Sequence, residues 1–176
     1  MPYLWIFLIL FLFASSAQAV ELFGVELAQA SRDQLRGAIK NAGVKLVREA
    51  GDDAFFDTYE ADSLMPGAKF LYLGFTKKDR QFAFAEYRFN GLSNEPLLQR
   101  LKQKYGQPQR AKPRFFSDYR YRWTDGSIEI NLYSDWSSYA TRLVYFNIQN
   151  LTELRAERGS FMSAVDSAQE YVQPAY

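Results

Sequence analysis

Two neighbouring segments, 119–123 and 127–134, alternate strictly between large apolar side chains and polar ones. The apolar positions are Tyr119, Tyr121, Trp123, Ile128, Ile130 and Leu132. The positions between them include Arg120, Arg122, Glu129, Asn131 and Tyr133. Asp125-Gly126 joins the segments and is a dipeptide that favours a tight hairpin turn. Because alternate residues of a strand point to opposite faces, this pattern predicts an antiparallel sheet with one covered face.

Two helices are predicted, and each ends at a glycine. The first begins at Ser31, whose side chain can form a capping box with Gln34, and ends at Gly43. The second begins after Asn94, a favourable N-cap residue, and ends at Gly106. Each helix carries an apolar stripe with helical spacing, so each is expected to cover a sheet.

The order of helices and strands repeats along the chain. Strands are predicted over 44–49, 54–61, 69–76, 81–89, 115–123, 127–134 and 139–148. A helix followed by extended segments therefore occurs twice, over about 31–90 and 94–148. We expect an α+β fold, in which two α-β-β-β(β) pseudo-repeats form one antiparallel sheet with helices packed on one face. Within 81–89, Phe82 and Phe84 are expected on one side of the strand, and Ala85 and Tyr87 on the other.

The N-terminal 19 residues have the pattern of a signal peptide. An apolar run over 4–14 is followed by small residues that end in Ala17-Gln18-Ala19. The run is too short to span a bilayer, which needs about 20 apolar residues. Cleavage after Ala19 would leave a single domain over 20–150 and a helical or flexible tail over 151–176.

The composition narrows both the location and the chemistry. There are 21 basic and 20 acidic residues and no cysteine. A cysteine-free exported chain fits a bacterial envelope, so we expect a soluble periplasmic or secreted protein without stable membrane insertion. The near-neutral charge argues against a nucleic-acid partner.

The absence of histidine and cysteine removes several kinds of active site. Nucleophiles that depend on imidazole, thiol nucleophiles and zinc sites with those ligands are excluded. We therefore expect no catalytic residues, no metal and no cofactor. Paired carboxylates would still allow a glycoside hydrolase, which is the remaining catalytic alternative.

The tandem arrangement of a capped helix and a meander over 31–148 resembles the β-lactamase-inhibitor-protein type of domain. One repeat at a time, it also resembles the small lipoprotein of the outer-membrane β-barrel assembly machinery. The resemblance rests on the order of elements. It implies an exported, non-catalytic protein that binds another macromolecule.

Aromatic residues make up 17% of the chain, and most are expected in the core. Trp136 and Tyr139 lie in a connection rich in serine and aspartate, and Tyr133 precedes it. Exposed aromatics in such a setting suit a sugar ring or a protein hot spot. The alternative is that Trp136 folds back over the edge of the sheet.

Two further segments contain candidate binding residues. Leu64 and Met65 precede a Pro-Gly turn, and they either pack against a helix, which we favour, or form a contact point. Arg120 and Arg122, together with Arg142 and Lys112, could form a basic sheet face that holds an acidic partner. The favoured alternative is that these arginines pair across strands with Glu129 and Asp118.

The leading hypothesis is an exported, non-catalytic binding or accessory protein of the bacterial envelope, whose partner is another envelope protein. The first alternative is a protein that binds cell-wall carbohydrate through Tyr133, Trp136 and Tyr139.

Overall fold

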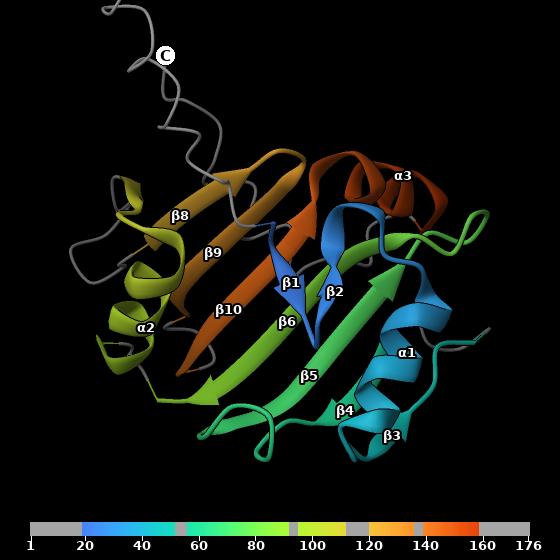
Figure 1. Ribbon diagram of the computed structural model, residues 1–176, viewed down its shortest axis with the longest axis horizontal. Coiled ribbons are helices and arrows are strands. Elements are labelled where there is room, and N and C mark those ends of the chain that lie inside the picture. Colours follow the sequence, from blue (N-terminus) through green and yellow to red (C-terminus); the bar gives the residue numbers. More distant parts are fainter. Residues whose placement is uncertain (1–18, 52–55, 92–94, 112–119, 136–138, 159–176) are drawn as a thin grey trace, which may run out of the picture.

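The computed structural model describes residues 19–51, 56–91, 95–111, 120–135 and 139–158. Eight of its strands form one antiparallel sheet, as Figure 1 shows. They are β3 (Leu46–Arg48), β4 (Phe56–Glu60), β5 (Ala68–Phe75), β6 (Phe82–Asn90), β7 (Gln109–Ala111), β8 (Arg120–Asp125), β9 (Ile128–Asp135) and β10 (Ala140–Asn147). Their spatial order is β3-β4-β5-β6-β10-β9-β8-β7, which confirms the α+β class.

The sheet consists of two halves with the same order of elements. Helix α1 (Arg32–Asn41) precedes β3 to β6, and helix α2 (Glu95–Tyr105) precedes β7 to β10. The halves meet where the last strand of each, β6 and β10, pair antiparallel in the middle of the sheet. The predicted pseudo-repeats are therefore confirmed, and the first strand of each forms an outer edge.

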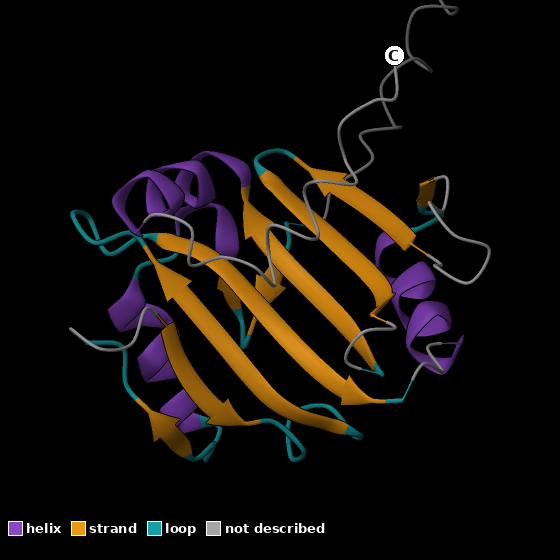
Figure 2. Ribbon diagram, turned by 180° about the vertical axis from the view of Figure 1, so that it is seen from behind, coloured by secondary structure: helices purple, strands orange, loops and turns teal. Residues whose placement is uncertain are grey.

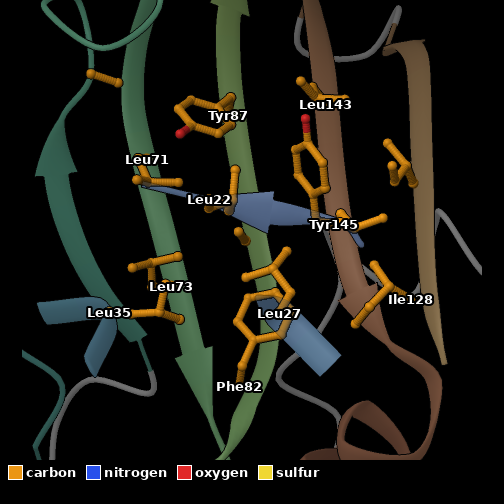
Figure 3. Packing of buried hydrophobic residues seen from close by; sticks show 14 of the residues in the cluster. Leu22, Leu27, Leu35, Leu71, Leu73, Phe82, Tyr87, Ile128, Leu143 and Tyr145 are labelled. Atoms are coloured by element: carbon orange, nitrogen blue, oxygen red, sulfur yellow. The ribbon is translucent and has the colours of Figure 1, made fainter. Parts of the chain in front are cut away.

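One face of the sheet, here called the inner face, carries the main hydrophobic core. It is covered by α1, α2, the short helix η1 (Leu27–Gln29), and the hairpin of β1 (Glu21–Leu22) and β2 (Val25–Glu26). Figure 3 shows Leu22, Leu27 and Leu35 from these elements over the side chains of the central strands. The fully buried residues of this core include Leu71, Leu73, Phe82, Ile130, Leu132 and Leu143.

The helix ends agree with the local sequence signals. The Gln34 amide donates to the Ser31 hydroxyl at 3.3 Å, and the Ser31 amide donates to the Gln34 side chain at 2.9 Å, which completes the capping box. Gly43 and Gly106 have φ values of +71° and +78°, a conformation that glycine adopts without strain. Asn94, the expected cap of α2, lies outside the described residues.

A third helix, α3 (Ile148–Arg158), packs on the opposite face of the sheet. Its Leu151 and Leu154 are buried against a second, smaller cluster, which comprises Ala83, Phe84, Tyr133, Val144 and Phe146. The Asn147 side chain accepts hydrogen bonds from the amides of Gln149 and Asn150, and it thereby caps the start of the helix. The two predicted helices, α1 and α2, pack on one face, as expected. Helix α3 differs from the prediction, because it covers part of the other face.

The expectation that Phe82 and Phe84 share one side of β6 is wrong. Pairing with β5 shifts between Gly74 and Phe75, so that β6 contains a bulge at this point. Phe82 consequently enters the inner core, while Phe84 lies on the opposite face. There its ring lies over Gly74, where an added Cβ would come within 2.0 Å of the ring.

Val20, the residue after the expected cleavage position, is part of the packed domain. Val20 belongs to the inner core, and its carbonyl accepts a hydrogen bond from the Leu27 amide at 2.9 Å. Residues 1–18 lie outside the described residues. Among the helices that the structure describes, none is long and apolar enough to cross a membrane.

Candidate functional site

The face of the sheet opposite the inner face is rich in arginine. Strand register places its side chains in three rows that run across the sheet. The first row is Glu60, Phe70, Arg88, Arg142, Tyr133 and Arg120. The second is Arg48, Thr58, Tyr72, Glu86, Val144, Asn131 and Arg122, and the third is Phe56, Gly74, Phe84, Phe146, Glu129 and Thr124. We call these three rows the arginine face; Figure 2 views the ribbon of the sheet from this side, with α3 at one corner.

The first row brings together arginines that are distant in sequence. Arg88 on β6 lies beside Arg142 on β10, which in turn lies beside Tyr133 on β9 and then Arg120 on β8. Because neighbouring strands are about 4.8 Å apart, the row from Arg88 to Arg120 spans about 14 Å. The guanidinium of Arg120 lies 4.7 Å from the centre of the Tyr133 ring, a favourable cation–π contact.

Glu86 is the acidic centre of this face. Its carboxylate accepts hydrogen bonds from Arg88 Nε at 2.6 Å and from Arg142 at 3.4 Å, and the residue is 1% exposed. Arg88 also stacks on Tyr72, with 4.6 Å between the guanidinium carbon and the ring centre. Burial has the largest effect on the pKa of Arg88 and lowers it, but the charge and hydrogen bond of Glu86 outweigh burial and raise the pKa overall.

The second glutamate that pairs with arginine is Glu129. Its carboxylate lies 4.0 Å from Arg122 and accepts a hydrogen bond from the Asn131 side chain at 2.9 Å. Arg122 also donates to the Gln109 side chain at 2.8 Å. The sequence predicts that Arg122 pairs with Glu129 across strands. The structure shows this ion pair, at the long distance of 4.0 Å.

The charges in the three rows do not balance. Five arginines (Arg48, Arg88, Arg120, Arg122 and Arg142) stand against three glutamates, Glu60, Glu86 and Glu129, which leaves an excess of two positive charges. Glu60 is itself paired at the edge with Lys45, at 2.6 Å. Among the described residues of the three rows, arginines therefore outnumber glutamates by two.

Part of this face is open to solvent. The side chains of Arg88 and Arg122 are 37% and 32% exposed, and Tyr72 and Phe70 are half-buried. Arg120 and Arg142 are buried, as are Tyr133 and Glu86. A ligand that approaches from solvent could therefore contact Arg48, which is exposed, as well as Arg88, Tyr72 and Arg122.

Three of the predicted site residues meet on the arginine face. Arg120, Arg122 and Tyr133 lie there together with Arg142, which the sequence also associated with them. Lys112 and Asp118 lie outside the described residues. Sequence reasoning did not select Arg88 or Tyr72, although the alternation of Glu86 and Arg88 with Ala85 and Tyr87 was a usable signal.

The other predicted site residues lie elsewhere. Leu64 and Met65 are half-buried and pack against the inner core, in agreement with the favoured alternative for them. Tyr139, in the turn just before β10, is 67% exposed and has a φ of +47°. Trp136 lies outside the described residues. Because Tyr133 is 5% exposed, it and Tyr139 do not form one exposed aromatic surface.

A separate cluster of charges is buried under the inner-face helix α1. Asp57 is fully buried and accepts two hydrogen bonds from Arg36 at 2.7 Å, one from Arg32 at 3.3 Å and one from the Ala50 amide at 2.7 Å. Burial alone would raise the pKa of Asp57 and is the largest single effect on it, but these donors together outweigh burial and lower the pKa. Burial, together with the nearby Asp57 charge, raises the pKa of Tyr59 to about 12.

This cluster ties α1 to the edge of the sheet. Arg36 also contacts Glu49 at 2.6 Å, and Arg32 also donates to the Ala50 carbonyl at 2.9 Å. The two arginines, Arg32 and Arg36, therefore contact two carboxylates, those of Asp57 and Glu49, and their hydrogen bonds stay within the cluster. In the described part of the chain, no three acidic side chains gather closely enough to hold a metal ion.

Comparisons with known proteins add a distant structural likeness. No protein-family model matches this chain, and no curated protein matches it. Among solved structures, a DUF4309 family protein (YjgB) from Bacillus subtilis is similar, with a TM-score of 0.45 and 15% sequence identity. The similarity covers 73% of this chain and 87% of that chain.

Proposed function

We propose that this is an exported, non-catalytic binding or accessory protein of the bacterial envelope, which holds a macromolecular partner on its arginine face. The observation that carries the proposal is the first row, where Arg88 and Arg142 lie side by side and Arg120 follows beyond Tyr133. Arginine and tyrosine, like tryptophan, are enriched among the residues that dominate binding energy at protein interfaces.

The chemistry of this face fits a partner rich in carboxylates. A guanidinium that stacks on an aromatic ring keeps its N–H groups directed outward along its edge, where they can bind a carboxylate in a bidentate manner. Arg88, whose side chain is 37% exposed, stacks in this way on Tyr72. The excess positive charge would also speed the approach of an acidic partner.

Export is supported by the sequence of residues 1–19, with its apolar run and small-residue site. The direct test is the mass of the protein purified from the envelope of the producing cell. The proposal predicts a chain that begins at Val20. A mass that includes Met1 or the apolar run would contradict export by a cleaved signal.

Binding at this face can be tested by photo-crosslinking in living cells. A photoreactive amino acid at Tyr72 would lie on the arginine face, and the same amino acid at Arg100 would lie on the exposed surface of α2, over the inner face. We expect one discrete crosslinked partner from position 72 and not from position 100, and we expect Arg88→Glu to remove it. The same set of products from both positions would overturn the proposal.

The carbohydrate alternative has a separate readout. Soluble cell-wall fragments would be titrated into the protein while tryptophan fluorescence is recorded. The proposal predicts no saturable change up to millimolar fragment. A saturable change that is lost on Tyr139→Ala would favour the carbohydrate reading instead.

A further inference from the structure

Arg88 is held from two sides on the arginine face. Its Nε donates to the buried carboxylate of Glu86 at 2.6 Å, and its guanidinium carbon lies 4.6 Å from the centre of the Tyr72 ring. The Tyr72 ring is in turn supported by the Phe56 ring, which meets it edge to face at 5.1 Å, and by the Phe70 ring at 6.1 Å. A side chain that is already held loses little freedom when a ligand binds. The guanidinium of Arg88 is therefore preorganised.

The other edge of this guanidinium is open to a ligand. In the part of the chain that the structure describes, Arg88 donates its hydrogen bond to Glu86 through Nε, and its two Nη groups donate to no acceptor. The side chain is 37% exposed, so solvent reaches it. Two Nη groups in one plane match the two oxygens of a carboxylate, and such bidentate contacts are among the strong hydrogen-bonded pairs.

Arg36 on the inner face shows the opposite arrangement. It donates from Nε and Nη2 to Asp57, at 2.7 Å each, and from Nη1 to Glu49 at 2.6 Å. All three of its nitrogen atoms are therefore engaged within the molecule. An ion pair by itself does not make a binding site, and Arg88 differs because its ion pair uses one edge of the guanidinium.

Two other exposed or partly exposed arginines of the face have at most one of these supports in the described structure. Arg48 lies 5.5 Å from the centre of the Phe56 ring, but no described carboxylate accepts a hydrogen bond from it. Arg122 lies 4.0 Å from Glu129, but no ring in the described part of the fold stacks on its guanidinium. Arg88 is the better anchor, since it has both supports.

The surroundings of Arg88 favour a singly charged anion that has apolar atoms beside it. Glu86 is 1% exposed, so its negative charge is poorly screened and repels a doubly charged phosphate more than a carboxylate. Phe70 lies directly opposite Arg88 in the strand register and is half-buried. Its ring can cover the methylene groups next to a carboxylate. A glutamate or aspartate side chain of a partner protein meets both conditions.

We propose that Arg88 anchors the acidic partner by binding one of its side-chain carboxylates between the two Nη groups, and that Tyr72 and Glu86 are positioning residues for this contact. The inference rests on the proposed function above, because it names the chemical group that the arginine face takes from that partner. A guanidinium is then required at position 88, and a positive charge alone is not sufficient.

The affinity for a fluorescent peptide of alternating glutamate and tyrosine, measured by anisotropy, tests this requirement. Arg88→Lys keeps the charge but loses the bidentate hydrogen bonds, so we expect binding to weaken by about tenfold. The matched control is Arg100→Lys on the exposed surface of α2, which should bind like wild type. Equal affinities of wild type and Arg88→Lys would overturn the inference.

The positioning role of Tyr72 has a separate readout. Tyr72→Phe keeps a ring beneath the guanidinium and should keep the affinity, whereas Tyr72→Leu removes the stacking and should weaken binding by about threefold. Urea unfolding of both variants shows whether they are equally folded. The same affinity for the two folded variants would contradict a role of the ring in holding Arg88.

NMR of wild-type protein labelled with ¹⁵N-arginine observes the contact directly. Acetyl-glutamate-amide carries one carboxylate, and acetyl-glutamine-amide is its matched neutral control. At equal ionic strength, we expect the first compound to shift the Nη signals of Arg88 saturably and to leave its Nε signal, which Glu86 holds, nearly unchanged. Equal effects of the two compounds, or a shift confined to Nε, would overturn the inference.

Three outcomes separate this inference from the proposed function. If the peptide binds wild type and Arg88→Lys equally but Arg122→Glu weakens binding, the proposed function stands and the inference is wrong. If acetyl-glutamate-amide shifts the Nη signals but neither the peptide nor a crosslinked partner binds, the carboxylate site is present and the proposed function fails. If methyl phosphate binds at Arg88 more tightly than acetyl-glutamate-amide, the assignment of a carboxylate ligand is wrong.

Discussion

The two clusters of arginine in this molecule differ in how their charge is compensated. Under α1, Arg32 and Arg36 meet Asp57 and Glu49, and Asp57 receives hydrogen bonds from both arginines and from a backbone amide. On the arginine face, Arg88 and Arg142 share the single carboxylate of Glu86, and five arginines stand against three glutamates.

We propose that the first cluster has a structural role and that the arginine face has a binding role. A compensated buried cluster fixes the position of α1 on the sheet and offers little to an outside ligand. On the arginine face, the side chains of Arg88 and Arg122 are partly exposed, so an outside ligand can reach them. The predictions below test this distinction, in order of expected effect.

The largest effect is expected at Asp57. Asp57→Ala leaves Arg36 and Arg32 without their buried carboxylate, and breaking a buried pair in this way costs about 3–5 kcal/mol of the free energy of unfolding. Urea unfolding of the variant and wild type measures the difference. The matched control is Glu60→Ala, whose exposed pair with Lys45 should cost less than about 1 kcal/mol. Equal losses in the two variants would contradict the structural role of the Asp57 cluster.

Gly74→Val should have the next largest effect. The new side chain would collide with the Phe84 ring, since a Cβ there lies 2.0 Å from it, and overpacking costs about 1–3 kcal/mol. Gly51→Val is the control, because no atom lies within 4 Å of an added Cβ there. In a Phe84→Ala background the cost of Gly74→Val should shrink, which a double-mutant cycle in urea measures. If Gly74→Val lost the same unfolding free energy in both backgrounds, the collision with the Phe84 ring would not be the cause of the loss.

The pH dependence of stability should also depend on Asp57. Its pKa in the folded state lies below the ordinary value of about 3.9, so its stabilising contribution is present above that value and is lost as pH falls through the folded pKa. Wild type should therefore lose more unfolding free energy between pH 5 and pH 2 than Asp57→Asn does. Parallel curves for the two proteins would contradict this assignment.

The smallest effect on stability is expected on the arginine face. Arg122→Gln removes a 4.0 Å ion pair from a side chain that is one-third exposed, so we expect a loss of less than about 1 kcal/mol. Arg36→Gln, the matched change in the compensated cluster, should cost more because Arg36 donates two hydrogen bonds at 2.7 Å to Asp57, whereas Arg122 lies 4.0 Å from Glu129. Thermal or urea unfolding of both variants measures the two losses of stability. A larger loss for Arg122→Gln than for Arg36→Gln would contradict the distinction between the two clusters.

Most of the fold could be predicted from local sequence signals. The capping box at Ser31, the glycines at 43 and 106 and the alternation in 119–134 act within a few residues, and the structure confirms the two-fold repeat of helix and strands. The bulge in β6 could not be predicted, because it depends on how Phe84 fits over Gly74 on the neighbouring strand.

The candidate site was also predictable only where local sequence signals determine it. Arg120, Arg122 and Tyr133 share one face by alternation alone. Their association with Arg88 and Tyr72 depends on β6 pairing with β10, a contact between the two halves that no local pattern specifies. The sequence therefore predicts only the β8–β9 part of the arginine face, and pairing between the distant strands β6 and β10 adds the rest.

The most direct test of the central claim is the affinity for a fluorescent peptide of alternating glutamate and tyrosine, measured by anisotropy at fixed salt. The claim is that the surplus arginines serve binding and not folding. We predict that Arg88→Glu with Arg122→Glu weakens binding by about tenfold or more, which corresponds to about 1.4 kcal/mol, while Arg100→Glu on α2 leaves it unchanged. Equal affinity in wild type and both variants would contradict the claim.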